Sequence, residues 1–258
     1  MPKFSANLSM LFTEVDFPDR FARASRAGFR AVEYLFPYAW SPDRLADALG
    51  KNNLQQVLFN LPAGNWEGGE RGIACIPGRE GEFQEGVGKA IEYAQALKCP
   101  RMNCLMGIWP EGESPEAIRQ TAVENLRFAA RALADADMQL LVEAINTIDI
   151  PGFYLGTTAD VLQLFEEVNH ANLWLQYDIY HMQIMEGDLI RTISGNLERI
   201  AHMQLADNPG RHEPGTGEIN YPNVFRTIDE TGYSGWIGCE YKPAGTTEEG
   251  LDWVKPYL

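Results

Sequence analysis

Eight short apolar runs, separated by longer amphipathic segments, most constrain how this chain can fold. The pattern predicts eight strands, at 4–10, 31–35, 54–60, 101–107, 140–144, 173–178, 202–206 and 236–240. Strands that alternate with helices pair in parallel, because each connection crosses back over the sheet. Eight such units in 258 residues, about 32 residues each, predict an α/β fold of a single (β/α)8 TIM barrel spanning residues 1–258.

The segments between the runs show helix-start and helix-stop signals. Ser41-Pro42 and Ser114-Pro115 are typical of an N-cap followed by a proline at the first helical position, and Gly28 is typical of a helix end. An open doubly wound sheet is the alternative, but it favours a glycine-rich turn after the first strand, which SANLSMLF lacks. The expected helices are 17–27, 42–50, 82–98, 115–136, 158–168, 187–197, 221–231 and 247–255.

The charge balance narrows the choice of partners. With 21 basic and 36 acidic residues, the net charge of −15 argues against nucleic acid and against an anionic membrane surface. No apolar run reaches the roughly 18 residues of a membrane span. The N-terminal MPKFSANLSMLF shows no signal-peptide pattern, and none of the four cysteines forms a C-x-x-C pair. We therefore expect a reduced, cytoplasmic chain that acts on a small molecule.

Oxygen-bearing side chains close four consecutive predicted strands. They are Glu143, Asp178, Gln204 and Glu240. The carboxyl ends of barrel strands meet at one mouth, where barrel enzymes carry their chemistry. Four such oxygens at one point favour a hard divalent cation, Mg²⁺ or Mn²⁺, over zinc. The plainer interpretation, that each is an ordinary polar residue at a strand end, stays open for any one of them.

Histidines and basic residues near the same mouth are candidate substrate ligands. His181 follows Asp178 by three residues and is placed to bind a substrate oxygen or orient a ligand. His202 shares a strand face with Gln204, one layer deeper, which favours packing over direct ligation.

Two loops concentrate the scarce basic residues. The segment 207–221 carries Arg211, and the long segment 61–80 carries Arg71 and Arg79. A long loop after a barrel strand favours a functional role, and arginine matches a carboxylate with a fork of donors. Lys242 is a further cationic candidate. The alternative is that Arg71 and Arg79 pair with Glu67, Glu70 or Glu80 at the surface.

Several long segments resemble the hydroxypyruvate isomerase family. They are SANLSMLF, LPAGNWEGGERGIACIPGRE, QYDIYHMQ, ADNPGRHEPGTGEINY and GWIGCEYKP, and the resemblance runs from residue 4 to near the C-terminus. The wider group is the xylose-isomerase-like barrel superfamily, which also contains ketose 3-epimerases and 2-oxo-tetronate isomerases.

The resemblance implies reversible conversion of hydroxypyruvate to tartronate semialdehyde, in keeping with glyoxylate metabolism. The two acid/base glutamates of the family fall on Glu143 and Glu240. The related epimerases bind a metal through Glu, Asp, His and Glu, so the match is Glu143, Asp178 and Glu240, with Gln204 in place of the histidine. Their D-x-x-H pattern falls on Asp178 and His181, and their substrate-contacting arginine on Arg211, with slightly different loop spacing.

Rival functions remain at this point. The same scaffold suits a 2-oxo-tetronate isomerase, a ketose 3-epimerase or a non-catalytic sugar-acid binding protein. A related DNA-repair nuclease needs a histidine-rich zinc site and a basic groove, and four histidines with a charge of −15 speak against it. The sequence leaves open the substrate chain length, the metal and the oligomeric state, a homo-oligomer included.

Overall fold

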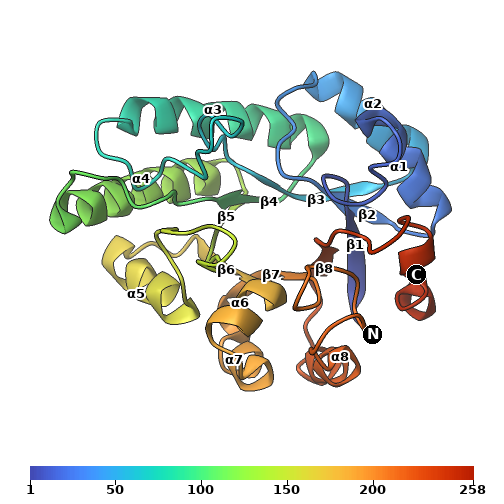
Figure 1. Cartoon of the computed structure of the whole chain (residues 1–258). Helices are drawn as coiled ribbons and strands as arrows, with labels where there is room; N and C mark the ends of the chain where they lie inside the picture. The colour runs from blue at the N-terminus through green and yellow to red at the C-terminus, as the bar shows by residue number, and fades with distance from the viewer.

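Eight parallel strands close into a barrel in the computed structural model, which describes residues 1–258 (Figure 1). The strands follow one another around the barrel in chain order, and the last pairs with the first. The predicted TIM barrel is therefore confirmed. The strands are β1 (Lys3–Asn7), β2 (Ala31–Glu33), β3 (Gln55–Asn60), β4 (Arg101–Cys104), β5 (Gln139–Glu143), β6 (Leu173–Asp178), β7 (Ile200–Leu205) and β8 (Trp236–Cys239).

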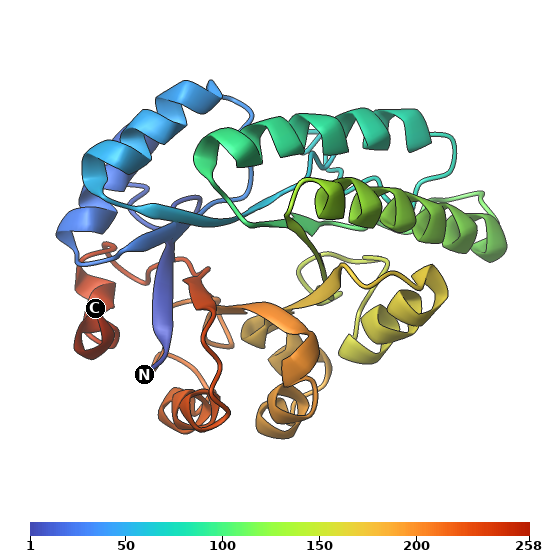
Figure 2. The same cartoon turned by 180° about the vertical axis from the view of Figure 1, so that it is seen from behind.

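Helices form an outer layer around the strands, as the front and back views show (Figures 1 and 2). None of them is long and apolar enough to cross a membrane. Three short 3-10 turns, η1 (Leu197–Arg199), η2 (Glu249–Leu251) and η3 (Lys255–Tyr257), complete the chain. The helices are α1 (Phe17–Arg26), α2 (Pro42–Asn52), α3 (Glu80–Leu97), α4 (Pro115–Asp135), α5 (Thr158–Val168), α6 (Ile179–Met185), α7 (Leu189–Gly195) and α8 (Tyr221–Glu230).

The predicted helix starts and stops follow local chemistry. The Ser114 hydroxyl accepts a hydrogen bond from the Ala117 amide, so it caps α4, while α2 begins at Pro42 without such a side-chain bond. Gly28 follows α1 with a φ of +104°, a left-handed conformation that glycine adopts at little steric cost.

Several segments differ from the expectation, and one of them is the run at 101–107, whose strand β4 ends at Cys104. The first run was expected to extend to residue 10, but β1 ends at Asn7, where the chain turns toward the barrel mouth. The helix expected at 247–255 is wrong: that stretch forms only short 3-10 turns, in keeping with the low helix propensity of Gly250. The seven-residue helix α6 was not expected, because it starts directly after β6 and is too short to show a periodic pattern.

The interior of the barrel is unusually polar, whereas the apolar core lies between the strands and the helices. Barrel interiors are normally filled by branched apolar side chains. Here fully buried polar side chains point inward, and burying them is favourable only if each finds a partner. They include Glu33, Asn60, Asn103, Gln176 and Gln204.

Candidate active site

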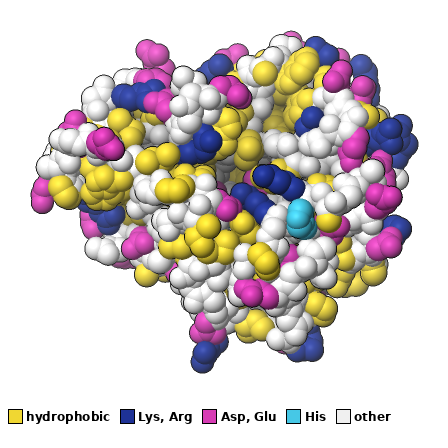
Figure 3. All heavy atoms as spheres, in the orientation of Figure 1, with side chains coloured by type: hydrophobic (Ala, Val, Ile, Leu, Met, Phe, Trp, Pro, Cys, Tyr) yellow, Lys and Arg dark blue, Asp and Glu magenta, His cyan; other side chains and the backbone are white.

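A cavity of about 560 Å³ opens where the strands end. Its walls combine apolar side chains such as Trp66 and Leu105 with acidic and basic groups. The space-filling view shows a hollow near the centre of this face, with basic side chains gathered at it (Figure 3). Such a mixture of apolar wall and few convergent polar groups is typical of a small-molecule site.

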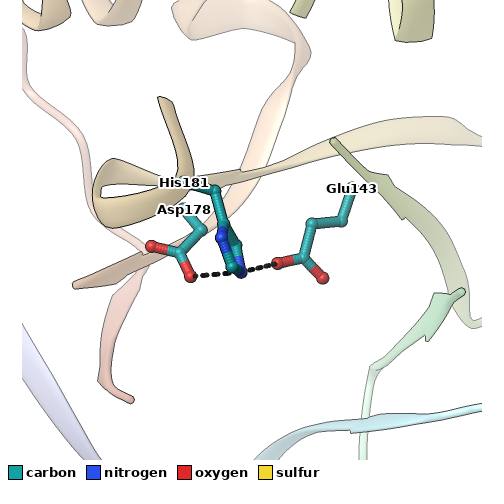
Figure 4. Close-up of side chains that lie close together, drawn as sticks. All are labelled: Glu143, Asp178 and His181. Carbon is teal, nitrogen blue, oxygen red and sulfur yellow. Dashed lines mark ion pairs between the residues drawn. The ribbon is translucent and has the colours of Figure 1, made fainter. Parts of the chain in front are cut away.

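Three buried carboxylates and one imidazole converge here. Glu143 ends β5, Asp178 ends β6, and Glu240 directly follows β8. His181 lies on the first turn of α6, which begins because the Asp178 carboxylate accepts the Tyr180 amide hydrogen at 2.8 Å. The His181 Nε2 atom is 3.5 Å from Asp178 Oδ2 and 3.9 Å from Glu143 Oε1 (Figure 4).

Burial dominates the acid-base behaviour of these groups. It raises the pKa of Asp178 to about 6 and that of Glu240 to about 8, although Arg211 opposes both shifts. The pKa of Glu143 lies well above its usual value, first because of burial and then because of the nearby Glu240 and Asp178. Burial, with the nearby Arg211, holds the pKa of His181 well below its usual value, so this imidazole is neutral.

The donor set fits a divalent cation. Ligand atoms of Glu143, Asp178 and His181 all lie within 4.8 Å of one another. Asp178 Oδ2 is buried and accepts no hydrogen bond from the protein, so it has an unshared oxygen directed into the site. Close carboxylates repel one another, and a cation between them removes this repulsion.

Gln204, the fourth expected metal ligand, has a different local role in this geometry. Its Oε1 accepts a hydrogen bond from Gln176 Nε2 at 2.6 Å, and its Nε2 donates to Glu33 Oε1 at 2.8 Å. The acidic and imidazole donors that lie closely grouped are Glu143, Asp178 and His181. A carbonyl oxygen keeps a second lone pair, which leaves Gln204 able to act as a ligand.

Arg211 is built into the carboxylate cluster. Its Nη2 donates to Glu240 Oε2 at 2.7 Å and lies 3.8 Å from Asp178 Oδ2. Its guanidinium carbon is 5.1 Å from the centre of the Tyr180 ring. Although burial lowers the pKa of Arg211, the surrounding carboxylates raise it, so the side chain stays charged.

The other expected cationic ligands divide into two groups. Arg71 and Lys242 line the cavity, and no acidic side chain forms an ion pair with either. Arg71 stacks over Trp66, 4.2 Å from the ring centre, and donates to the carbonyl oxygens of Trp66 and Glu70. Arg79 lies outside the cavity lining.

Arg79 is held by two glutamates instead. It forms ion pairs with Glu70 and Glu82 on the loop and on α3. The Glu70 pair is part of the surface pairing that the sequence left as an alternative, whereas Glu82 was not among the expected partners, and we do not propose Arg79 as a substrate ligand. Its charge is compensated before any substrate arrives.

Sequence reasoning missed the polar residues of the first four strands. Asn7, Glu33 and Asn60 end β1, β2 and β3, and Asn103 lies one residue before the end of β4. Applied to every expected run, the strand-end rule that singled out Glu143 would have found Asn60, whereas the other three lie inside the expected runs and only the observed strand bounds place them near the barrel mouth. Gln176, two residues before Asp178, was missed as well, although the two-residue period of a strand puts both on one face.

Two further contacts concern the histidines. The Asn146 amide lies 2.6 Å from His181 Nδ1 and orients that ring. His202 is fully buried and its Nε2 lies 2.8 Å from Glu33 Oε2. His202 therefore packs in the barrel interior, as expected, and does not join the ligand group.

Comparison with known proteins identifies the family. A family model described as a xylose isomerase-like TIM barrel matches residues 21–257. The chain is 55% identical to a hydroxypyruvate isomerase from Escherichia coli (strain K12) over 100% of both chains. It is 47% identical to a 2-oxo-tetronate isomerase from Cupriavidus necator, over 100% of this chain and 99% of the relative.

A solved structure supports the same grouping. The crystal structure of a protein named AP endonuclease, family 2, from Brucella melitensis superposes with a TM-score of 0.97 at 47% identity, covering 100% of this chain and 99% of that one. The closed eight-stranded barrel agrees with these matches. The chain belongs to the xylose isomerase-like TIM barrel family, in the group that includes hydroxypyruvate isomerases and 2-oxo-tetronate isomerases.

Proposed function

We propose that this protein is an isomerase that interconverts hydroxypyruvate and tartronate semialdehyde (2-hydroxy-3-oxopropanoate) through an enediolate. The observation that carries the proposal is the pair of buried glutamates, Glu143 and Glu240, at one cavity that also exposes cationic side chains. The 55% identity to a hydroxypyruvate isomerase over the whole chain supports the choice of substrate.

The two glutamates suit the proton transfer. Glu143 Oε2 accepts hydrogen bonds from Asn103 and Gln176, at 2.9 and 3.0 Å, which orient the carboxylate so that one oxygen would bind the cation and the other would take a proton from the substrate. Glu240 lies at the same cavity, held by Arg211 at 2.7 Å, and would return a proton to the neighbouring carbon. A positioned acid or base of this kind contributes about 10²–10⁴-fold to rate.

We further propose that Glu143, Asp178, Gln204 and Glu240 hold the cation, Mg²⁺ or Mn²⁺. The oxygen-rich set favours these hard ions, and the unpartnered Asp178 Oδ2 supports the assignment. When bound, such an ion acts as a Lewis acid that stabilises negative charge on the substrate oxygens. His181, neutral and held by Asn146, is placed to hydrogen-bond a substrate oxygen.

The cations of the cavity select an acid substrate. Arg71 and Lys242, free of acidic partners, would bind the substrate carboxylate. Arg211, already bonded to Glu240, would orient that glutamate and contact the reacting oxygens. An endonuclease role fits poorly, because His181 is the one histidine of the carboxylate cluster and the net charge is −15.

A 2-oxo-tetronate isomerase is the second candidate. The 47% identity to such an enzyme favours it, and a cavity of about 560 Å³ has room for a four-carbon acid. The chemistry would be the same. A ketose 3-epimerase and a non-catalytic sugar-acid binding protein are less favoured, because neither accounts for both the uncompensated cations and the paired glutamates.

Solvent exchange by NMR tests the proposal. The Mg²⁺-loaded protein is incubated in D₂O with hydroxypyruvate, and separately with a four-carbon 2-oxo acid. We expect deuterium at the carbon next to the carbonyl and formation of the isomer, faster with hydroxypyruvate. Faster turnover of the four-carbon acid would transfer the proposal to the second candidate. Tight binding of either acid without deuterium uptake would indicate a non-catalytic binding protein.

The cellular setting is part of the same proposal. Four buried free cysteines, none in a disulfide, support a cytoplasmic location. A role in glyoxylate metabolism follows from the proposed substrate. We propose that residues 1–258 act as one catalytic domain.

A further inference from the structure

A buried glutamate that the proposed reaction does not use lies beneath the site. Glu33, at the end of β2, is 1% exposed. Four donors surround its carboxylate: Ser5 Oγ at 2.9 Å, Asn7 Nδ2 at 3.2 Å, and His202 Nε2 and Gln204 Nε2, both at 2.8 Å. A Cβ at position 238 would overlap this carboxylate, so glycine there leaves room for it.

Two series of hydrogen bonds, here called paths, start at Glu33, and the first leads to Glu143. A carboxylate only accepts, so Gln204 must turn its NH₂ group toward Glu33. Its carbonyl oxygen then faces the other way and accepts from Gln176 Nε2 at 2.6 Å. The same Gln176 NH₂ group donates to Glu143 Oε2 at 3.0 Å. The Glu33 carboxylate therefore sets the orientation of the side-chain amides of Gln204 and Gln176.

The second path leads to Glu240. Asn7 Nδ2 lies 3.2 Å from Glu33 Oε1 and 3.2 Å from Glu240 Oε1, so one NH₂ group serves both carboxylates. The Asn7 carbonyl oxygen accepts the Ser9 amide hydrogen at 3.0 Å, which fixes this orientation from the other side.

We infer that Glu33 is a positioning residue whose carboxylate makes the side-chain amides of the barrel interior present their NH₂ groups, rather than their oxygens, to Glu143 and Glu240. This inference rests on the proposed roles of those two glutamates. Without a fixed acceptor at position 33, Gln204 and Gln176 are free to reverse together. Reversal would set the Gln176 oxygen against Glu143 and push its carboxylate out of place.

Glu33→Gln tests the inference with nearly unchanged volume. We expect kcat for the proposed isomerisation in the Mg²⁺-loaded enzyme to fall at least about tenfold, the usual effect of losing a hydrogen bond to a charged group. KM should change less, because Glu33 does not line the cavity. A folded Glu33→Gln protein with wild-type kcat would overturn the inference.

Ser5→Ala is the matched control. It removes another donor to the same carboxylate, but Ser5 lies on neither path. We expect Ser5→Ala to keep wild-type kcat even if both variants melt at a lower temperature. An equal loss of kcat in both variants would show that Glu33 only stabilises the interior and would overturn its positioning role.

The double variant Glu33→Gln/Gln204→Glu moves the acceptor one step along the first path. The new carboxylate at 204 accepts from positions 33 and 176, so Gln176 again donates to Glu143. We expect kcat to recover at least partly relative to Glu33→Gln, or, if that variant does not fold, to remain measurable. A folded double variant with no recovered activity counts against the inference. An inactive wild-type enzyme would instead refute the proposed function.

Discussion

The two halves of the barrel mouth carry different chemistry. Strands β5–β8 contribute the carboxylates Glu143, Asp178 and Glu240, the groups with raised pKa values. Strands β1–β4 contribute mostly amides, such as Asn7 and Asn103, which donate to the carboxylates of the adjacent strands β8 and β5. The difference shows that one half holds the reactive groups, while the other supplies amides that help to orient them.

Removing a carboxylate from the reactive half should have the largest effect. Glu143→Gln and Glu240→Gln should each lower kcat by about 10²–10⁴-fold, because each removes an acid-base group at nearly constant volume. Steady-state kinetics measure the loss, and circular dichroism checks that the fold is intact. Near wild-type turnover in either variant would remove the two-glutamate mechanism.

Changing Arg211 should have the next largest effect. Arg211→Met leaves Glu240 without its 2.7 Å partner, and losing a charged hydrogen bond of this kind should lower kcat/KM by about 10–100-fold. Arg211→Lys keeps the charge but lacks the planar fork of donors, so its kcat/KM should lie between those of wild type and Arg211→Met. A wild-type kcat/KM in Arg211→Met would move substrate orientation to Arg71 and Lys242.

A change in the amide half should be milder. Asn103→Leu removes one of two donors to Glu143 Oε2, while Gln176 still donates to it. We expect about a tenfold lower kcat, the effect of one hydrogen bond to a charged group. Were this variant as inactive as Glu143→Gln, the division into a reactive and an orienting half would be too simple.

The raised pKa of Glu240 predicts a pH effect on the metal-free protein. Its value of about 8 in the fold exceeds the usual 4.5, so folding favours the protonated form. This stabilisation is complete at low pH and is lost as the pH rises from about 4.5 through 8. Glu240→Gln, treated with EDTA, should therefore gain melting temperature relative to wild type across this range. A difference in melting temperature between Glu240→Gln and wild type that does not change with pH would contradict the raised pKa of Glu240.

The smallest effect should come from outside both halves. Arg79→Met breaks surface ion pairs with Glu70 and Glu82, and exposed pairs contribute about 0–1 kcal/mol. We expect Arg79→Met to keep kcat and KM near wild type. By contrast, Arg71→Met should show a clear rise in KM. An equal rise in both would return Arg79 to the list of substrate ligands.

The sequence by itself determined the barrel and the acidic strand ends. Apolar periodicity is a local property, and the meeting of parallel strand ends at one mouth follows from the fold class alone. That reasoning placed Glu143, Asp178 and Glu240 together, and it placed His181 beside them. It failed for residues 247–255 and for α6, where the elements are too short for a period to show.

Only the tertiary structure decided which groups face one another. Asn7 and Glu240 are 233 positions apart and meet because β8 closes on β1. Arg79 and Arg71 look alike in the sequence, yet one is taken up by two glutamates while the other stacks on Trp66 beside the cavity. Glu33 acquires its role from four donors on two other strands. Contacts of this kind depend on the register and closure of the sheet, which no local pattern of residues encodes.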